Sequence, residues 1–133
     1  MKDDQPGLGP LAGLATALAS SAGAPIIVLA WDMPFVPPSL LLELRRRGTG
    51  MDAVVPVHDA QREPLCAFYS SRALASCRSL LAAGDRRADA LAENLSRVAW
   101  LEGAALASFG DPAHLFTSVD TPERLAALGG AYP

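Results

Sequence analysis

The stretch A-P-I-I-V-L-A-W-D-M-P-F-V-P-P, residues 24–38, decides the fold. Its residues 25–30 form an apolar, β-branched run without alternation, which is typical of a strand buried on both faces in a parallel sheet. The run is followed by a carboxylate, Asp32. Ligands of open α/β sheets bind at the carboxyl ends of the strands, so we expect this acid to face a site. One carboxylate there can hold Mg²⁺, which leaves its other positions to water and substrate phosphates. The alternative is that Asp32 only caps the turn that follows.

Composition limits the class of protein. The 133 residues are 50% hydrophobic and carry a net charge of −3, which predicts one globular domain without a basic field for nucleic acid. Cys66 and Cys77 lack metal-ligand spacing and indicate reduced thiols in a cytoplasmic protein. No stretch reaches the roughly 18 apolar residues of a membrane span, and the amino-terminal region is a poor signal peptide.

A helix is predicted to begin at Gly9-Pro10. Proline suits the first helical position, and Gly9 at the cap is expected to leave the first helical amides accessible to a ligand. An apolar stripe follows at spacings of three and four, from Leu11 to Leu18. Small side chains such as Gly13 allow the helix to lie close to a sheet or to a nucleotide, and either use explains them.

The remaining pattern predicts alternating strands and helices. We expect a helix from Pro38 to about Arg47 whose three terminal arginines are solvated. A strand at 53–57 contains Pro56 and is therefore expected to be less central than the first strand. A strand at 64–69 can pair with it as an antiparallel hairpin.

Further along, a helix is predicted over residues 71–83, with Cys77 in its packing stripe, and a shorter helix is predicted after a cap at Asp85. A strand follows at 98–101, an irregular connection at 103–112, and a strand at 116–119 before a final helix. His58 and His114 fall in predicted loops and are interpreted as surface histidines.

Four motifs in order resemble the molybdenum cofactor guanylyltransferase family, the MobA-type nucleotidyltransferases. They are G-P-L-A-G-L at 9–14, W-D-M-P-F-V-P-P at 31–38, R-E-P-L-C-A-F-Y at 62–69 and S-V-D-T-P-E-R-L at 118–125. The resemblance implies a Rossmann-like α/β fold of three layers, with a mostly parallel sheet and helices on both faces. It also implies transfer of GMP from GTP to Mo-molybdopterin, with release of pyrophosphate and formation of the guanine dinucleotide cofactor.

The resemblance also assigns roles to residues. Asp32 is implied to be the catalytic Mg²⁺ ligand at the GTP phosphates, where a metal neutralises charge on the reacting groups. Asp3 matches an acid that contacts the nucleotide, and Asp4 replaces it if the alignment shifts by one. Ser118 and Asp120 stand where the family has asparagines near the pterin. The nucleotide pocket is implied to be lined by Gly9, Pro10, Leu11 and Gly13.

Departures from the family pattern lead to further expectations. The family's first strand and its L-A-G-G-x-S-x-R-M-G-x-D-K loop are absent from residues 1–133, so the chain is expected to be the carboxyl-terminal two-thirds of one domain, without turnover by itself. An exposed flank of the first strand would then favour self-association. Two other hypotheses are a sister enzyme that uses CTP and a non-catalytic remnant or adaptor of the same fold.

Overall fold

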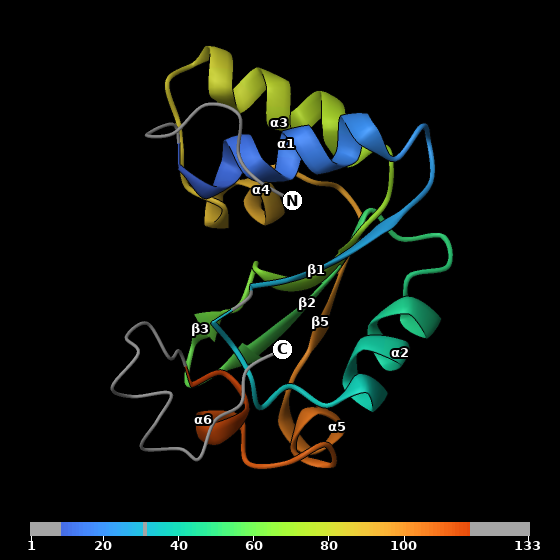
Figure 1. Ribbon diagram of the computed structural model, residues 1–133, viewed down its shortest axis with the longest axis vertical. Helices are drawn as coiled ribbons and strands as arrows, with labels where there is room; N and C mark the ends of the chain where they lie inside the picture. The colour runs from blue at the N-terminus through green and yellow to red at the C-terminus, as the bar shows by residue number, and fades with distance from the viewer. Residues whose placement is uncertain (1–8, 31, 118–133) are drawn as a thin grey trace.

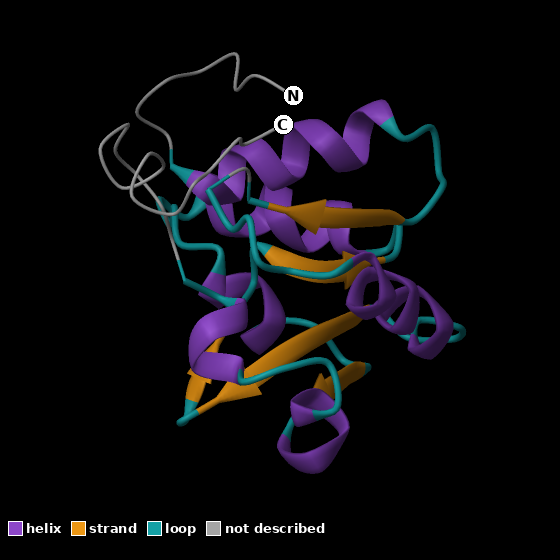
Figure 2. Cartoon of the chain, turned by 60° about the horizontal axis from the view of Figure 1, so that its bottom comes forward, coloured by secondary structure: helices purple, strands orange, loops and turns teal. Residues whose placement is uncertain are grey.

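The described chain forms one five-stranded sheet with helices on both faces (Figures 1 and 2). The computed structural model describes residues 9–30 and 32–117. The strands are β1 (Ile26–Leu29), β2 (Ala53–His58), β3 (Gln61–Arg62), β4 (Cys66–Tyr69) and β5 (Val98–Leu101). The helices are α1 (Pro10–Ser20), α2 (Pro38–Arg47), α3 (Ala73–Ala82), α4 (Asp89–Glu93), α5 (Gly103–Ala107) and α6 (Pro112–Leu115).

The alternation of side chains along the strands builds two hydrophobic cores, one on each face of the sheet. One face contributes Ala53, Val55, Ala67 and Tyr69 to a core with α1, α3 and α4. The opposite face contributes Val54, Cys66 and Phe68 to a core with α2, α5 and α6. The three-layer α/β architecture expected from the sequence is therefore confirmed.

The strand directions differ in part from a mostly parallel sheet. β1, β2 and β5 run the same way, and β2 pairs with β5 in parallel. However, β4 lies antiparallel between β1 and β2, and β3 is antiparallel to β2. The reason is the hairpin formed by β2, β3 and β4, because a short turn can join only antiparallel neighbours. The antiparallel hairpin itself was expected.

The order of centrality is the reverse of the expectation. β2 pairs with β3, β4 and β5, whereas β1 pairs only with β4 in the described part of the chain and is half-buried, with Leu29 exposed. Pro56 is tolerated in β2 because the pairing with β4 ends at Val54, so the missing amide is not needed there. The Pro56 carbonyl still accepts a hydrogen bond from the Glu63 amide at 2.9 Å.

The helix boundaries follow the local signals closely. α1 and α2 begin at Pro10 and Pro38, as predicted, and Arg46 and Arg47 at the end of α2 pair with Glu43. Gly48 caps α2 where a side chain would not fit, because a Cβ atom there would lie 2.5 Å from the ring of Phe68.

Four local predictions are wrong. His58 is not a surface histidine in a loop, because it ends β2 and its side chain is only 15% exposed. Residues 103–112 are not irregular, because α5 occupies their first half. Phe116 caps α6 instead of starting a strand, and the predicted segment from residue 118 onward lies outside the described residues. Ala88 caps α4, whereas Asp85 accepts a hydrogen bond from the Arg87 amide in the preceding turn. In these segments the intrinsic propensities of the residues do not decide the conformation, and a turn or a contact with another part of the chain does.

A buried carboxylate joins the amino end of β2 to its neighbours. Asp52 is 8% exposed; its Oδ1 accepts from Arg72 Nε at 2.7 Å, and its Oδ2 accepts from the Arg97 amide at 3.2 Å. The Arg72 guanidinium lowers the pKa of Asp52. Because β1 and β2 run the same way, this cluster lies at the end of the sheet opposite Asp32. Its role is structural.

The remaining sequence-based expectations concern the cysteines and the membrane. Cys66 and Cys77 are free and buried, and burial raises the pKa of their thiols to about 12 and about 11, respectively. Within residues 9–30 and 32–117, no helix is long and apolar enough to cross a membrane.

Candidate functional site

A cavity of about 680 Å³ lies between α1 and β1. One wall is the face of α1 that carries Gly13, Leu14 and Ala17, and the other is the whole of β1. The volume is within the range of about 300–1,000 Å³ that is usual for small-molecule sites. The cavity is lined by Gly9, Pro10, Gly13, Leu14, Ala17, Ile26, Ile27, Val28, Leu29, Ala30, Asp32 and Leu65.

Asp32 is one of the residues that line this cavity. It is half-buried, and it follows the carboxyl end of β1, as the sequence predicted. The chain before it is fixed because the Ala30 amide donates to the Leu65 carbonyl at 2.8 Å, and the Met33 amide donates back to the Ala30 carbonyl at 3.1 Å. These bonds fix the backbone on both sides of Asp32, whose neighbours in the lining of the cavity are apolar.

The start of α1 is held by the loop that precedes α4. Gly9 has φ +82°, and a Cβ atom there would lie 3.0 Å from the Arg86 carbonyl oxygen. The Leu11 amide donates to the same carbonyl at 3.2 Å. One helical amide that the sequence left for a ligand is therefore used inside the protein, and Gly9 has a structural reason of its own.

The small residues of α1 leave room within the cavity. A Cβ atom on Gly13 would meet nothing within 4 Å among the described atoms, so packing inside the described chain does not require glycine there. Gly13 is also a poor helix former in the middle of α1. Both observations fit a helix surface that another group approaches closely.

The predicted site residues are only partly brought together. Gly9, Pro10, Gly13 and Asp32 line the same cavity. The side chain of Leu11 is fully buried in the core, so only its backbone is near the site. The remaining predicted residues, Asp3 with its alternative Asp4, and Ser118 and Asp120, lie outside the described residues.

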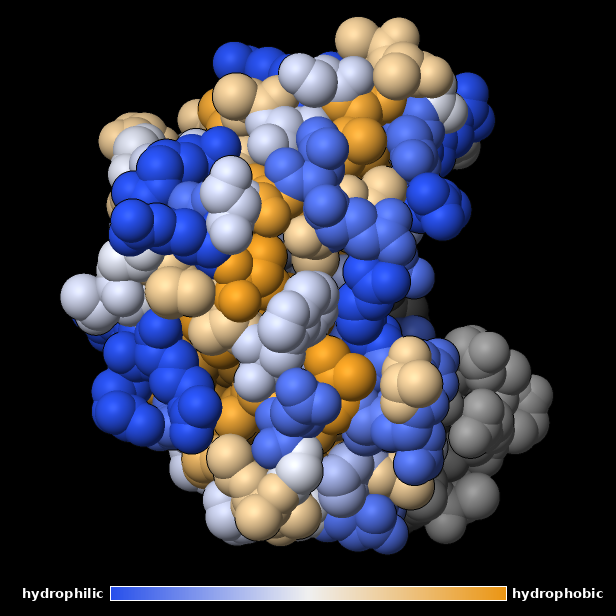
Figure 3. Space-filling view, turned by 180° about the vertical axis from the view of Figure 1, so that it is seen from behind, coloured by the Kyte–Doolittle hydropathy of each residue, from blue (hydrophilic) through white to orange (hydrophobic). Residues whose placement is uncertain are grey.

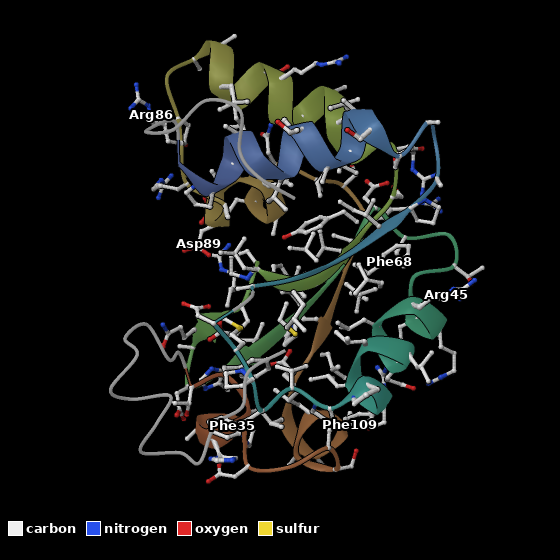
Figure 4. The ribbon with its side chains drawn as sticks, in the orientation of Figure 1. Phe35, Arg45, Phe68, Arg86, Asp89 and Phe109 are labelled. Atoms are coloured by element: carbon white, nitrogen blue, oxygen red, sulfur yellow. The ribbon has the colours of Figure 1, made fainter. Side chains whose placement is uncertain are left out.

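A second cavity, of about 460 Å³, adjoins the first, since both are lined by Pro10 and Leu65. Arg86 and Asp89 lie on the same side of the molecule, beside the start of α1 (Figure 4). The outline of the molecule is indented between the helical layer of α1, α3 and α4 and the remainder, with hydrophilic residues around the indentation (Figure 3). The second cavity is lined by Pro10, Met33, Arg62, Glu63, Pro64, Leu65, Arg86, Arg87, Ala88 and Asp89.

Sequence reasoning missed the charged residues of this second cavity. Arg86-Arg87 directly follows Gly84-Asp85, and a glycine-acid turn followed by two cations is a signal from which this polar cluster could have been predicted. Glu63 lay within a quoted motif without an assigned role. The tertiary structure alone shows that the two segments face the same space, because they are more than 20 residues apart.

Arg62 and Arg87 each have a carboxylate partner. Arg62 Nη2 donates to Glu93 Oε2 at 2.8 Å, and its guanidinium carbon lies 5.8 Å from the centroid of the Trp100 ring. Arg87 pairs with Asp85, and that hydrogen bond lowers the pKa of the aspartate. Charged side chains that are paired in this way form part of the lining of the second cavity.

The donor set at Asp32 fits a magnesium ion bound together with a substrate. Among the described residues there is no group of three or more His, Cys, Asp or Glu side chains that could hold a metal by itself. Mg²⁺ does not need such a cage, because it is usually bound through one or two carboxylates together with substrate phosphates and water. The half-buried carboxylate of Asp32, which lines the cavity, meets that requirement.

The fold defines an open-sheet α/β domain, with a cavity beside β1 that Asp32 helps to line. Residues 1–98 match the MobA-like NTP transferase domain, and the chain belongs to this family. The description of the family is that of a nucleotidyltransferase domain.

Named relatives agree with this assignment. A probable molybdenum cofactor guanylyltransferase of Methanothermobacter thermautotrophicus is 37% identical over 100 residues, covering 72% of this chain and 51% of the relative. A probable molybdenum cofactor guanylyltransferase of Chloroflexus aggregans is 35% identical over 128 residues, covering 92% of this chain and 60% of the relative. The crystal structure of molybdopterin-guanine dinucleotide biosynthesis protein A from Archaeoglobus fulgidus matches with a TM-score of 0.76 and 31% identity. The match covers 96% of this chain and 64% of that protein. The chain therefore spans between half and two thirds of the length of these proteins.

Proposed function

We propose that the chain takes part in the transfer of GMP from GTP to Mo-molybdopterin, which forms the molybdopterin guanine dinucleotide cofactor. The observation that carries the proposal is that Asp32 lines the cavity between α1 and β1. The names of the relatives from M. thermautotrophicus and C. aggregans give a guanylyl group as the group transferred and the molybdenum cofactor as the acceptor, and GTP as the donor is what the family resemblance implies.

In this proposal the chain binds and orients the nucleotide. Gly13 and Ala17 allow the nucleotide to approach the backbone of α1, and the apolar side chains of β1 exclude water from one side of it. Asp32 would hold Mg²⁺ at the phosphates. Mg²⁺ bound there supplies charge neutralisation at the reacting phosphorus and the departing pyrophosphate. Asp3 and the backbone of Leu11 are proposed as further nucleotide contacts.

The acceptor is proposed to lie next to the nucleotide. Ser118 and Asp120 remain the proposed acceptor contacts from the sequence. The adjoining cavity offers a second set of polar groups, because Arg62, Arg86 and Arg87 line it. An anionic acceptor placed there would be near Asp32, since Met33 lines the same cavity.

The proposal is tested by Mg²⁺-dependent GTP binding to the purified chain. Isothermal titration with GTP, with and without Mg²⁺, is expected to show tighter binding with the metal, and Asp32→Asn is expected to remove that difference while the circular dichroism spectrum stays unchanged. Asp59→Asn is the matched control, because Asp59 lies in the exposed turn between β2 and β3. Metal-independent binding, or an unchanged metal effect in Asp32→Asn, would contradict the proposed role.

The other hypotheses have their own outcomes. Tighter Mg²⁺-dependent binding of CTP than of GTP would favour the cytidylyltransferase. Absence of nucleotide binding would favour the non-catalytic remnant or adaptor. Incubation with GTP, Mg²⁺ and Mo-molybdopterin, followed by chromatography of the product, checks the expectation that the chain alone gives no turnover.

Self-association through β1 is a further proposal about partners. β1 has one hydrogen-bonded neighbour in the described part of the chain, and its four residues, Ile-Ile-Val-Leu, carry no charge that would protect an edge. Light scattering coupled to size exclusion at rising concentration is expected to show dimers, and a monomer throughout would refute the proposal. A cytoplasmic location likewise stays a prediction.

A further inference from the structure

The second cavity contains a carboxylate that the proposed phosphate chemistry does not use. Glu63 lines this cavity together with the apolar side chains of Met33, Pro64 and Leu65. The Glu63 side chain is only 12% exposed, so its carboxylate is largely removed from water. Burial of a carboxylate is unfavourable unless hydrogen bonds compensate for it, which makes its partners informative.

Glu63 is held in place from two sides. Its amide donates to the Pro56 carbonyl at 2.9 Å, which fixes the backbone against β2. Its Oε2 lies 2.9 Å from His58 Nε2, and burial raises the pKa of the carboxyl group. The salt bridges of the described residues pair Glu63 with His58 and not with an arginine of the same cavity.

The histidine determines how the carboxylate can act. His58 Nδ1 is buried and has no hydrogen-bond partner among the described residues, so a proton is better placed on Nε2. The ring is held by stacking on Phe116, with centroids 5.0 Å apart. In this arrangement Nε2–H donates to Glu63, and the carboxylate keeps the remaining lone pairs of its two oxygens as acceptors for a ligand.

We propose that Glu63 is a specificity-determining residue that recognises a 2-amino-4-oxopyrimidine ring by accepting hydrogen bonds from its amino group and its adjacent ring N–H. A carboxylate presents two acceptors side by side, which match two parallel N–H donors. Guanine and pterin share this ring, and the inference rests on the proposed function because that function names both. The pairing edge of cytosine offers acceptors at N3 and O2, so the same carboxylate disfavours a CTP substrate.

The test compares ring pairs that differ at the amino group. Pterin is compared with lumazine, which has a carbonyl in place of the amino group, by fluorescence titration of the full chain. GTP is compared with ITP, which lacks the amino group, by calorimetry. The wild-type chain is expected to bind the amino-bearing member of at least one pair about 10 to 100 times more tightly, the range for one hydrogen bond to a charged acceptor.

Variants then assign that preference to Glu63. Glu63→Gln, which keeps the size of the side chain, is expected to reduce the preference at least tenfold. Glu102→Gln is the matched control, because Glu102 is exposed and is not part of the lining of either cavity, and it is expected to leave the preference unchanged. Loss of preference in the pterin pair places the acceptor ring at Glu63, and loss in the nucleotide pair places the guanine base there.

Two results would overturn the inference: no wild-type preference within either pair, or preferences that Glu63→Gln leaves intact. These results are separable from failure of the proposed function. Mg²⁺-dependent GTP binding through Asp32 with unchanged ring preferences removes only the role of Glu63. A Glu63-dependent preference without any Mg²⁺-dependent GTP binding removes only the proposed function.

Discussion

Replacement of Gly13 by alanine is expected to change the stability of the fold and the affinity of the cavity for its ligand in opposite directions. Gly13 lies inside α1, where glycine is less favourable than alanine by about 0.8–1.0 kcal/mol. The added methyl group meets nothing within 4 Å among the described atoms, so no clash offsets that gain. We therefore expect the free energy of unfolding to rise by about 1 kcal/mol and the melting temperature to rise by about 3–6 °C.

Ligand binding is expected to change in the opposite direction. Gly13 lines the cavity between α1 and β1, and a methyl group would enter the space proposed for the nucleotide. Overpacking by one methyl group typically costs about 1–3 kcal/mol, which corresponds to roughly a 5- to 150-fold loss of GTP affinity. Thermal denaturation by circular dichroism and calorimetric titration with Mg²⁺ and GTP measure the two effects on the same preparation.

The control is Ala19→Gly on the exposed face of the same helix. It is expected to lower the stability by a similar amount and to leave GTP affinity unchanged. A Gly13→Ala chain that is less stable than the wild type would show that the space is filled in solution. A more stable chain with unchanged affinity would show that the nucleotide does not approach this part of α1.

Three further predictions concern the fold. Asp52→Asn is expected to lower the free energy of unfolding by about 1–2 kcal/mol, because it weakens charged hydrogen bonds whose arginine partner is partly exposed. The pKa of Asp52 is lowered in the folded state, so the stability difference between the wild type and Asp52→Asn should have its full size above about pH 4 and should disappear as the pH falls through the lowered pKa. Urea titrations at several pH values measure this difference. A stability difference that does not change with pH would contradict the prediction. Gly48→Ala is expected to cost about 1–3 kcal/mol, because its methyl group meets the buried ring of Phe68, and an unchanged urea midpoint would refute that contact. Cys66 and Cys77 are expected to resist alkylation at pH 8 until the protein unfolds, and rapid labelling of the native chain would show that they are not buried.

The sequence by itself determined most of the elements. The prolines at positions 10 and 38 define helix starts through their preset φ, and the apolar run at 98–101 has the bounds of β5. These signals are local, because they depend on the conformational preferences of a few neighbouring residues. The position of Asp32 after a strand could also be predicted from the sequence, because that prediction depends only on where one apolar run ends.

The tertiary structure alone decided which strand is central and which side chains share a cavity. β2 is central despite Pro56, because its pairing with β4 ends at Val54 and the sheet therefore does not need the amide hydrogen that proline lacks. Arg86 holds the start of α1 from a distance of more than 70 residues, and Glu63 lines the same cavity as Arg86 although more than 20 residues separate them. Such contacts depend on how elements pack and not on local preference, so no pattern of neighbouring residues encodes them.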